Sequence, residues 1–83
     1  MEDNDKRREH RQRVLKAGKI VYASGSIVID CTIRNLSDTG ARLQVPTTVA
    51  IPDRFELVEA ASGRRHPARV IWRKADLMGV RFD

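Results

Sequence analysis

The 83-residue chain lacks the cysteines of a disulfide-rich protein and the long apolar runs of a membrane protein. It contains one cysteine, Cys31, so it cannot form an internal disulfide framework, which fits a reducing, cytoplasmic setting. No apolar run approaches the roughly 20 residues of a membrane span, and the N-terminal segment lacks the apolar centre of a signal peptide. A chain this short forms one small domain with little room for an internal active-site cavity. We therefore expect a cytoplasmic single-domain protein without a membrane segment.

The sequence also lacks the residue patterns of an enzyme active site and of a metal site. The two histidines, His10 and His66, stand in no motif that supplies a nucleophile with a base. Cys31 lies on the apolar face of a predicted strand and should pack in the core, and no residues have the spacing of zinc ligands. His66 precedes Pro67 at the start of a predicted strand and is expected at the surface. The sequence therefore predicts neither an enzyme nor a metal site.

What the chain does have is a concentrated positive charge. Its net charge is +5, from 16 Lys and Arg against 11 Asp and Glu. Residues 6–16 hold six bases and one acid, a net +5, whereas residues 1–5 carry −3 and residues 17–83 carry ten bases and seven acids, a net +3. A basic run is usually solvated surface, and any partner that it binds should be anionic.

Beyond Gly18, apolar residues recur at every second position, which is typical of half-buried β-strands. Turn-forming residues interrupt the pattern at short intervals. Six short strands, each with one apolar face, predict an all-β fold, a six-stranded antiparallel β-barrel, because closure buries one face and removes exposed strand edges. The predicted strands cover residues 19–23, 27–34, 41–45, 55–60, 68–73 and 78–82.

The basic segment has two interpretations that the sequence leaves open. Residues 5–16 form either a short helix that ends at Gly18 or a mobile arm, since Val14 and Leu15 supply only a thin apolar stripe. We divide the chain into a basic N-terminal arm, residues 1–16, and a barrel, residues 17–83. The chain ends at Asp83, directly after the last predicted strand, so we expect no C-terminal helix.

Two groups of polar residues are candidates for a binding site. The first is the arginine-rich run of residues 7–11, RREHR, in which a helical turn would place Arg7 and Arg11 on one face. Arginine suits an anionic ligand, because its planar fork binds phosphate oxygens or the O6 and N7 edge of guanine through two hydrogen bonds.

The second group is residues 35–40, NLSDTG, between two predicted strands. Asn, Ser, Asp and Gly are the residues that turns use, so a purely structural role is the simpler interpretation. The same residues also suit binding, because the Asn35 amide and the Ser37 hydroxyl match a base edge. Gly40 permits the close approach of a ligand or of the arm.

Taken together and in this order, the two groups resemble the signatures of the PilZ family, whose members commonly bind the bacterial messenger cyclic di-GMP. Those signatures are Arg-x-x-x-Arg and Asp/Asn-x-Ser-x-x-Gly, matched here by residues 7–11 and 35–40. Residues 70–72, VIW, and 78–82, MGVRF, are similar to the family's last hairpin. The resemblance extends from residue 6 to residue 82 and implies a six-stranded antiparallel barrel over which the arginine arm folds when ligand is present.

The resemblance also implies roles for the matched residues. The arginines would contact the phosphates and guanine edges of cyclic di-GMP, with Arg8 in a supporting position. Asn35 and Ser37 would meet a guanine and its neighbouring backbone, and Gly40 would keep the surface open. No further cofactor is expected. The candidate ligand-binding residues are Arg7, Arg8, Arg11, Asn35, Ser37 and Gly40.

The implied function is that of a bacterial receptor that orders its arm on binding cyclic di-GMP and passes the signal to an unidentified protein effector. Two alternatives remain: a PilZ-like adaptor that does not bind the nucleotide, and a small basic barrel that binds single-stranded nucleic acid. The nucleic-acid alternative ranks lowest, because Trp72 and Phe82 fall at predicted core positions and leave few aromatic residues for stacking. Nucleic acid and membranes are therefore not expected as partners.

Overall fold

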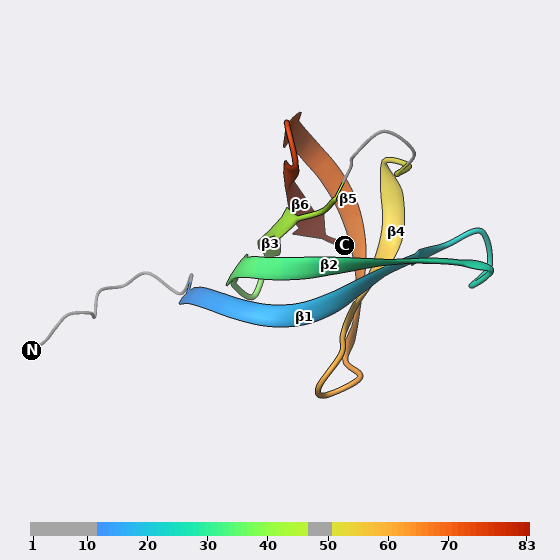
Figure 1. Ribbon diagram of the computed structural model, residues 1–83, viewed down its shortest axis with the longest axis horizontal. Coiled ribbons are helices and arrows are strands. Elements are labelled where there is room, and N and C mark those ends of the chain that lie inside the picture. The colour runs from blue at the N-terminus through green and yellow to red at the C-terminus, as the bar shows by residue number, and fades with distance from the viewer. Residues whose placement is uncertain (1–11, 47–50) are drawn as a thin grey trace, which may run out of the picture.

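The computed structural model describes residues 12–46 and 51–83, and its regular elements are all β-strands (Figure 1). The strands pair antiparallel in the order β1-β2-β3-β6-β5-β4, and β4 pairs with β1 to close a barrel. The predicted all-β, six-stranded antiparallel barrel is therefore confirmed. The six strands are β1 (Gln12–Tyr22), β2 (Ile27–Leu36), β3 (Gly40–Gln44), β4 (Arg54–Glu59), β5 (Arg65–Lys74) and β6 (Leu77–Phe82).

One apolar cluster fills the barrel, and every strand contributes to it. Cys31 is buried in this cluster, as predicted. Its burial, with a smaller contribution from the Asp30 carboxylate, raises the pKa of the thiol to about 11, so the thiol is protonated at neutral pH. The buried core consists of Ile20, Cys31, Ile33, Leu43, Val45, Ile51, Phe55, Leu57, Ala68, Met78 and Val80.

The first strand begins earlier than the sequence pattern indicates. β1 starts at Gln12, so residues 12–16, which we assigned to the arm, belong to the strand that pairs with β2. The helical alternative does not hold for these residues, and residues 5–11 lie outside the described part of the chain. Gly18 is not a helix cap but a buried position within β1, where a Cβ atom would come within 3.0 Å of the Ile33 side chain.

Trp72 lies on the outer surface, so its predicted core position is wrong. Alternation from Ala68 and Val70 would turn Trp72 inward. The register between β5 and β6 shifts between Val70 and Trp72, however, and the extra residue, Ile71, changes the phase of the alternation. As a result Ile71 and Trp72 are 59% and 40% exposed. Phe82, the other aromatic residue predicted to be buried, is half-buried and packs against the core.

A buried carboxylate joins three strands at one end of the barrel. The Glu59 side chain is 7% exposed, and its Oε2 accepts a hydrogen bond from Nε2 of His66 at 2.7 Å. Its Oε1 lies 3.4 Å from Nζ of Lys16 on β1. The His66 ring stacks on Phe82, with 4.4 Å between ring centroids. His66 is therefore largely buried and holds β4, β5 and β6 together, contrary to the surface position that we expected.

The replacement Glu59→Gln tests this cluster. We expect the free energy of unfolding at neutral pH to fall by about 1.5–3 kcal/mol, because a charge-assisted hydrogen bond is lost. The hydrogen bond from His66 is the main cause that lowers the pKa of Glu59 below 4.5. Its stabilising contribution is therefore fully present above pH 4.5 and is lost as the pH falls through the folded-state pKa.

Urea denaturation of both proteins across this pH range is the measurement. The difference in stability should be present above pH 4.5 and should disappear in more acidic solution. A difference that stays constant to low pH would contradict the assignment. Glu56→Gln is the control: its ion pair with Arg65 is more exposed, so the loss should be about 0–1 kcal/mol.

Candidate functional site

The second predicted motif forms the turn between β2 and β3, and Ser37 organises it. The Ser37 hydroxyl oxygen accepts hydrogen bonds from the backbone N–H groups of Thr39 and Gly40, both at 3.3 Å. The backbone N–H of Ser37 donates to the Gly40 carbonyl at 2.9 Å. These bonds are those of a serine-stabilised turn. Ser37 therefore has a structural role in addition to the binding role predicted for it.

Gly40 is required by the barrel itself. It begins β3 opposite Arg81 of β6, and a Cβ atom at this position would collide with the carbonyl oxygen of Val80. The missing side chain thus allows β3 and β6 to approach closely. The space that a side chain at position 40 would fill is occupied by the backbone of β6, so Gly40 has a structural role, and its role in ligand binding stays a prediction.

Asn35 lies in a row of residues that crosses four strands on the outside of the barrel. Asn35 pairs with Arg42 of β3, Arg42 with Gly79 of β6, and Gly79 with Trp72 of β5. The residues on either side of this row in β3 and β6 turn toward the core, so alternation turns the row outward. We call Asn35, Arg42, Gly79 and Trp72 the outer row. It presents an amide, a guanidinium group and an indole beside the β2–β3 turn.

Trp72 is held against the sheet by the other members of the row. A Cβ atom on Gly79 would collide with the indole Nε1 and would lie 2.8 Å from Cδ1, so the five-membered ring covers the glycine. The Arg42 Cζ atom lies 6.0 Å from the indole ring centroid, at the range of a cation–π interaction. These contacts fix the indole while much of its surface stays accessible.

The surface around the outer row is positively charged. Within the described residues, neither Arg42 nor Arg81 has a carboxylate partner, and the Asn35 amide makes no side-chain hydrogen bond. Arg69 has only a long contact, 3.8 Å, to the carboxylate of Asp83. An anion that approaches this face therefore meets guanidinium groups that are available for charge-assisted hydrogen bonds.

The three predicted arginines, Arg7, Arg8 and Arg11, lie outside the described residues. Gln12, the first residue of β1, pairs with Leu36 at the end of β2. The arginine-rich run directly precedes Gln12 in the sequence. Both predicted motifs are therefore attached to the same end of the β1–β2 pair.

Comparison with models of known protein families identifies the family of this chain. A family model described as the PilZ domain matches residues 5–83, almost the whole chain. The chain belongs to the PilZ domain family. PilZ domains are ligand-binding and adaptor domains, generally linked to cyclic di-GMP, and they are not an enzyme family. No curated protein matches this chain.

Two residues of this PilZ domain's outer row, Arg42 and Trp72, were not among the predicted site residues. The sequence contains a signal for Arg42, because Ala41 and Leu43 are predicted to face inward and the residue between them must face outward. Trp72 has no such signal. Its position depends on the irregular pairing of β5 with β6, which the residue types near it do not reveal.

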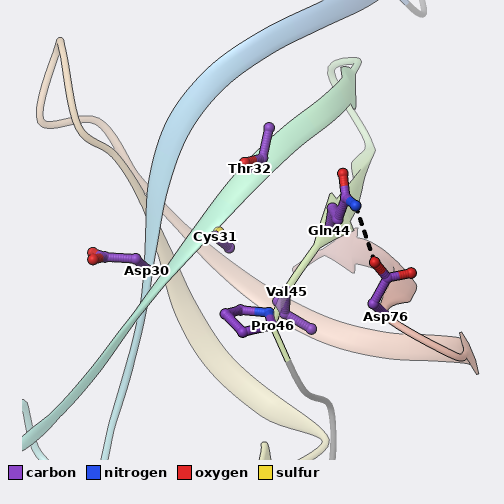
Figure 2. A pocket seen from close by; sticks show the side chains of 7 residues that line it. All are labelled: Asp30, Cys31, Thr32, Gln44, Val45, Pro46 and Asp76. Carbon is purple, nitrogen blue, oxygen red and sulfur yellow. Dashed lines mark hydrogen bonds between the residues drawn. The ribbon is translucent and has the colours of Figure 1, made fainter.

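A separate depression of about 300 Å³ lies where β2 separates from the end of β3 (Figure 2). The Gln44 Nε2 atom donates to Asp76 at 3.0 Å, and Lys19 pairs with Asp30 at 2.7 Å, so both acids already have partners. Asn35, Ser37 and Gly40, the predicted site residues within the described part of the chain, do not line it, and the described residues contain no group of side chains suited to a metal ion. The lining residues are Asp30, Cys31, Thr32, Gln44, Val45, Pro46 and Asp76.

Among the described residues, none forms a helix long and apolar enough to cross a membrane.

The replacement Gly79→Ala tests the position of Trp72. The added methyl group takes the space of the indole and must displace it, at a cost of about 1–3 kcal/mol. Trp72 is the only tryptophan, so the emission spectrum reports on this side chain alone. We expect the emission maximum to move to longer wavelength as the indole becomes more exposed.

Gly63→Ala, in the β4–β5 turn, is the control for this measurement. Nothing lies within 4 Å of a Cβ atom at Gly63, but its φ of 76° makes alanine unfavourable there. This variant should lose stability without a change in emission. An unchanged spectrum for Gly79→Ala would show that the indole does not cover the glycine.

Proposed function

We propose that this PilZ domain is a cytoplasmic receptor for cyclic di-GMP that transmits the level of the messenger to a protein partner. The outer row is the observation that supports the proposal, because it presents three different recognition groups on the face of the barrel next to the β2–β3 turn. Cyclic di-GMP has two phosphates and two guanine bases. Each group of the row therefore has a chemical counterpart in this ligand.

The three groups of the outer row suit different parts of the ligand. The accessible surface of Trp72 can stack on a guanine, an interaction worth about 1–3 kcal/mol per base. Arg42 can donate to a phosphate or to the O6 and N7 edge of a guanine, with about 1.5–3 kcal/mol for each charged hydrogen bond. The Asn35 amide supplies a donor and an acceptor for a base edge.

The N-terminal arginines extend this site in the proposal. Arg7 and Arg11 contact the phosphates and guanine edges, and Arg8 supports them. Contacts from these residues hold the N-terminal segment against the barrel beside the point where Gln12 enters β1. Ordering a segment costs about 1–2 kcal/mol per residue, which several charged hydrogen bonds offset. The bound state then presents a surface, made of segment and barrel together, for the protein partner.

Isothermal titration calorimetry of the full chain with cyclic di-GMP tests the receptor function. We expect saturable binding by the unaltered protein. Arg7→Ala and Arg11→Ala should each weaken binding by about tenfold or more, because each removes at least one charged hydrogen bond. The melting temperature of the free protein should stay nearly unchanged.

The control is Arg64→Ala, which makes the same change of charge in the β4–β5 turn and should keep the affinity of the unaltered protein. Equal losses from all three variants would indicate a diffuse charge effect. No detectable binding at high micromolar ligand would overturn the receptor function and favour a protein adaptor. Binding of a single-stranded oligonucleotide instead, with a steep salt dependence, would support the nucleic-acid alternative, for which exposed Trp72 supplies one stacking residue.

Trp72→Ala tests whether the outer row is part of the ligand site. Loss of one stacked base should weaken cyclic di-GMP binding by about five- to a hundredfold, and Trp72→Phe should retain part of the affinity. Ile71→Ala is the control, because Ile71 is the exposed neighbour outside the row. In the unaltered protein, saturating ligand should also change Trp72 emission. An unchanged affinity for Trp72→Ala would exclude the indole from the site.

A further inference from the structure

The hairpin formed by β1 and β2 carries an apolar surface that the proposed ligand site does not use. This hairpin projects beyond the rest of the barrel (Figure 1). Near its turn Val21 pairs with Val28, and Tyr22 pairs with Ile27. Successive residues of a strand face opposite sides, so each side of the ribbon carries one of these apolar pairs. Ile27 and Val28 are 40% and 51% exposed.

The same part of β2 has an edge without a partner strand. β1 pairs with β2 as far as Ile27, whereas β3 pairs with β2 only from Thr32 to Leu36. Beyond Gln44 the chain leaves β2, and the depression in Figure 2 lies at this separation. Among the described residues, residues 27–31 therefore have a neighbouring strand on one side only. Barrel closure, which we expected to remove exposed edges, does not remove this one.

An open edge with apolar residues is a template for another strand. Proteins usually block such edges with lysine, proline or an inward-pointing charge. Residues 27–31 contain no lysine and no proline, and the one charge among them, Asp30, is paired with Lys19 of β1 at 2.7 Å. The edge of β2 therefore lacks the features that would keep a second strand away.

The charge distribution indicates which partner fits this edge. Residues 20–33 contain no lysine or arginine, although the chain has 16 of them in 83 residues. Asp30 is the only charged residue in this stretch. Two copies of a chain with a net charge of +5 repel each other least where the basic residues are absent. The absence of basic residues also gives an anionic partner nothing to bind here.

We infer that the edge of β2 at residues 27–29 pairs antiparallel with the same edge of a second copy of this chain. A two-fold axis at Val28 places Val28 opposite its own counterpart and Ile27 opposite Ile29 of the second copy. β-branched residues that face each other across strands stabilise a sheet. In this register Asp30 faces Ser26, so no like charges are opposed.

The inferred dimer is weak and leaves the proposed ligand site free. Pairing of two short edges buries less area than the roughly 1,200–2,000 Å² of stable complexes, so the dimer forms reversibly as concentration rises. Asn35 follows Val28 by seven residues, which is about 23 Å along the strand. The outer rows of the two copies therefore lie at opposite ends of the joined ribbons. Self-association and ligand binding are then independent properties.

Analytical ultracentrifugation of the full chain, over about a hundredfold range of concentration, tests the inference. We expect the mass of the unaltered protein to rise from one copy toward two. Val28→Lys places two lysines opposite each other at the centre of the pairing and should prevent the rise. The matched control, Ile71→Lys, makes the same change at an exposed apolar residue of β5 and should dimerise like the unaltered protein.

A second variant and a second measurement test the inference even if Val28→Lys does not fold. Val28→Thr keeps the β-branched shape and the strand propensity, and it should weaken the dimer by about several-fold. Hydrogen exchange of residues 27–29 should slow with increasing concentration in the unaltered protein and in Ile71→Lys, but not in Val28→Lys. A mass of one copy at every concentration, growth beyond two copies, or equal loss with Ile71→Lys would overturn the inference. Cyclic di-GMP titration of Val28→Lys separates the two proposals, since affinity for the ligand should not change.

Discussion

Strands β3 and β6 pair from Gly40 to Gln44, and this pairing joins the part of the chain that holds β1 and β2 to the part that holds β4 and β5. Single backbone hydrogen bonds extend it at both ends, from Phe82 to Thr39 and from Val45 to Asp76. The close approach at Gly40 is possible only without a side chain. The outer row crosses this junction, so Arg42 and Trp72, which are 30 positions apart in the sequence, meet only because β3 and β6 are paired.

The features that sequence could predict are those that depend on local geometry. A two-residue period reports which face of a strand is buried, so the six strands and core residues such as Leu43 and Met78 followed from it. Turn chemistry is also local, and it identified Ser37. The exposure of Trp72 depends on an irregularity in the pairing of β5 with β6, and the need for glycine at position 40 depends on the backbone of β6. Both are tertiary effects that a single segment does not contain.

Mutations in the β2–β3 turn and mutations in the outer row give different information about ligand binding. The Ser37 hydroxyl holds the backbone of the turn, and Gly40 allows two strands to meet, so replacing either one perturbs the fold together with any ligand. Arg42 and Trp72 lie on the outer surface and contribute little to the core. Replacing residues of the strands therefore tests the proposed recognition of ligand without disturbing the backbone of the turn.

The single thiol gives this barrel a property that the other buried side chains do not share. With a pKa of about 11, only about one Cys31 in ten thousand is a thiolate at neutral pH. The sulfur also lies in the apolar core, and Cys31 is only 7% exposed. A thiol reagent therefore reacts when β2 separates from the barrel, and its rate of reaction measures how often that opening occurs. Cys31 thus makes the opening of the barrel measurable in the unaltered chain, without an introduced label.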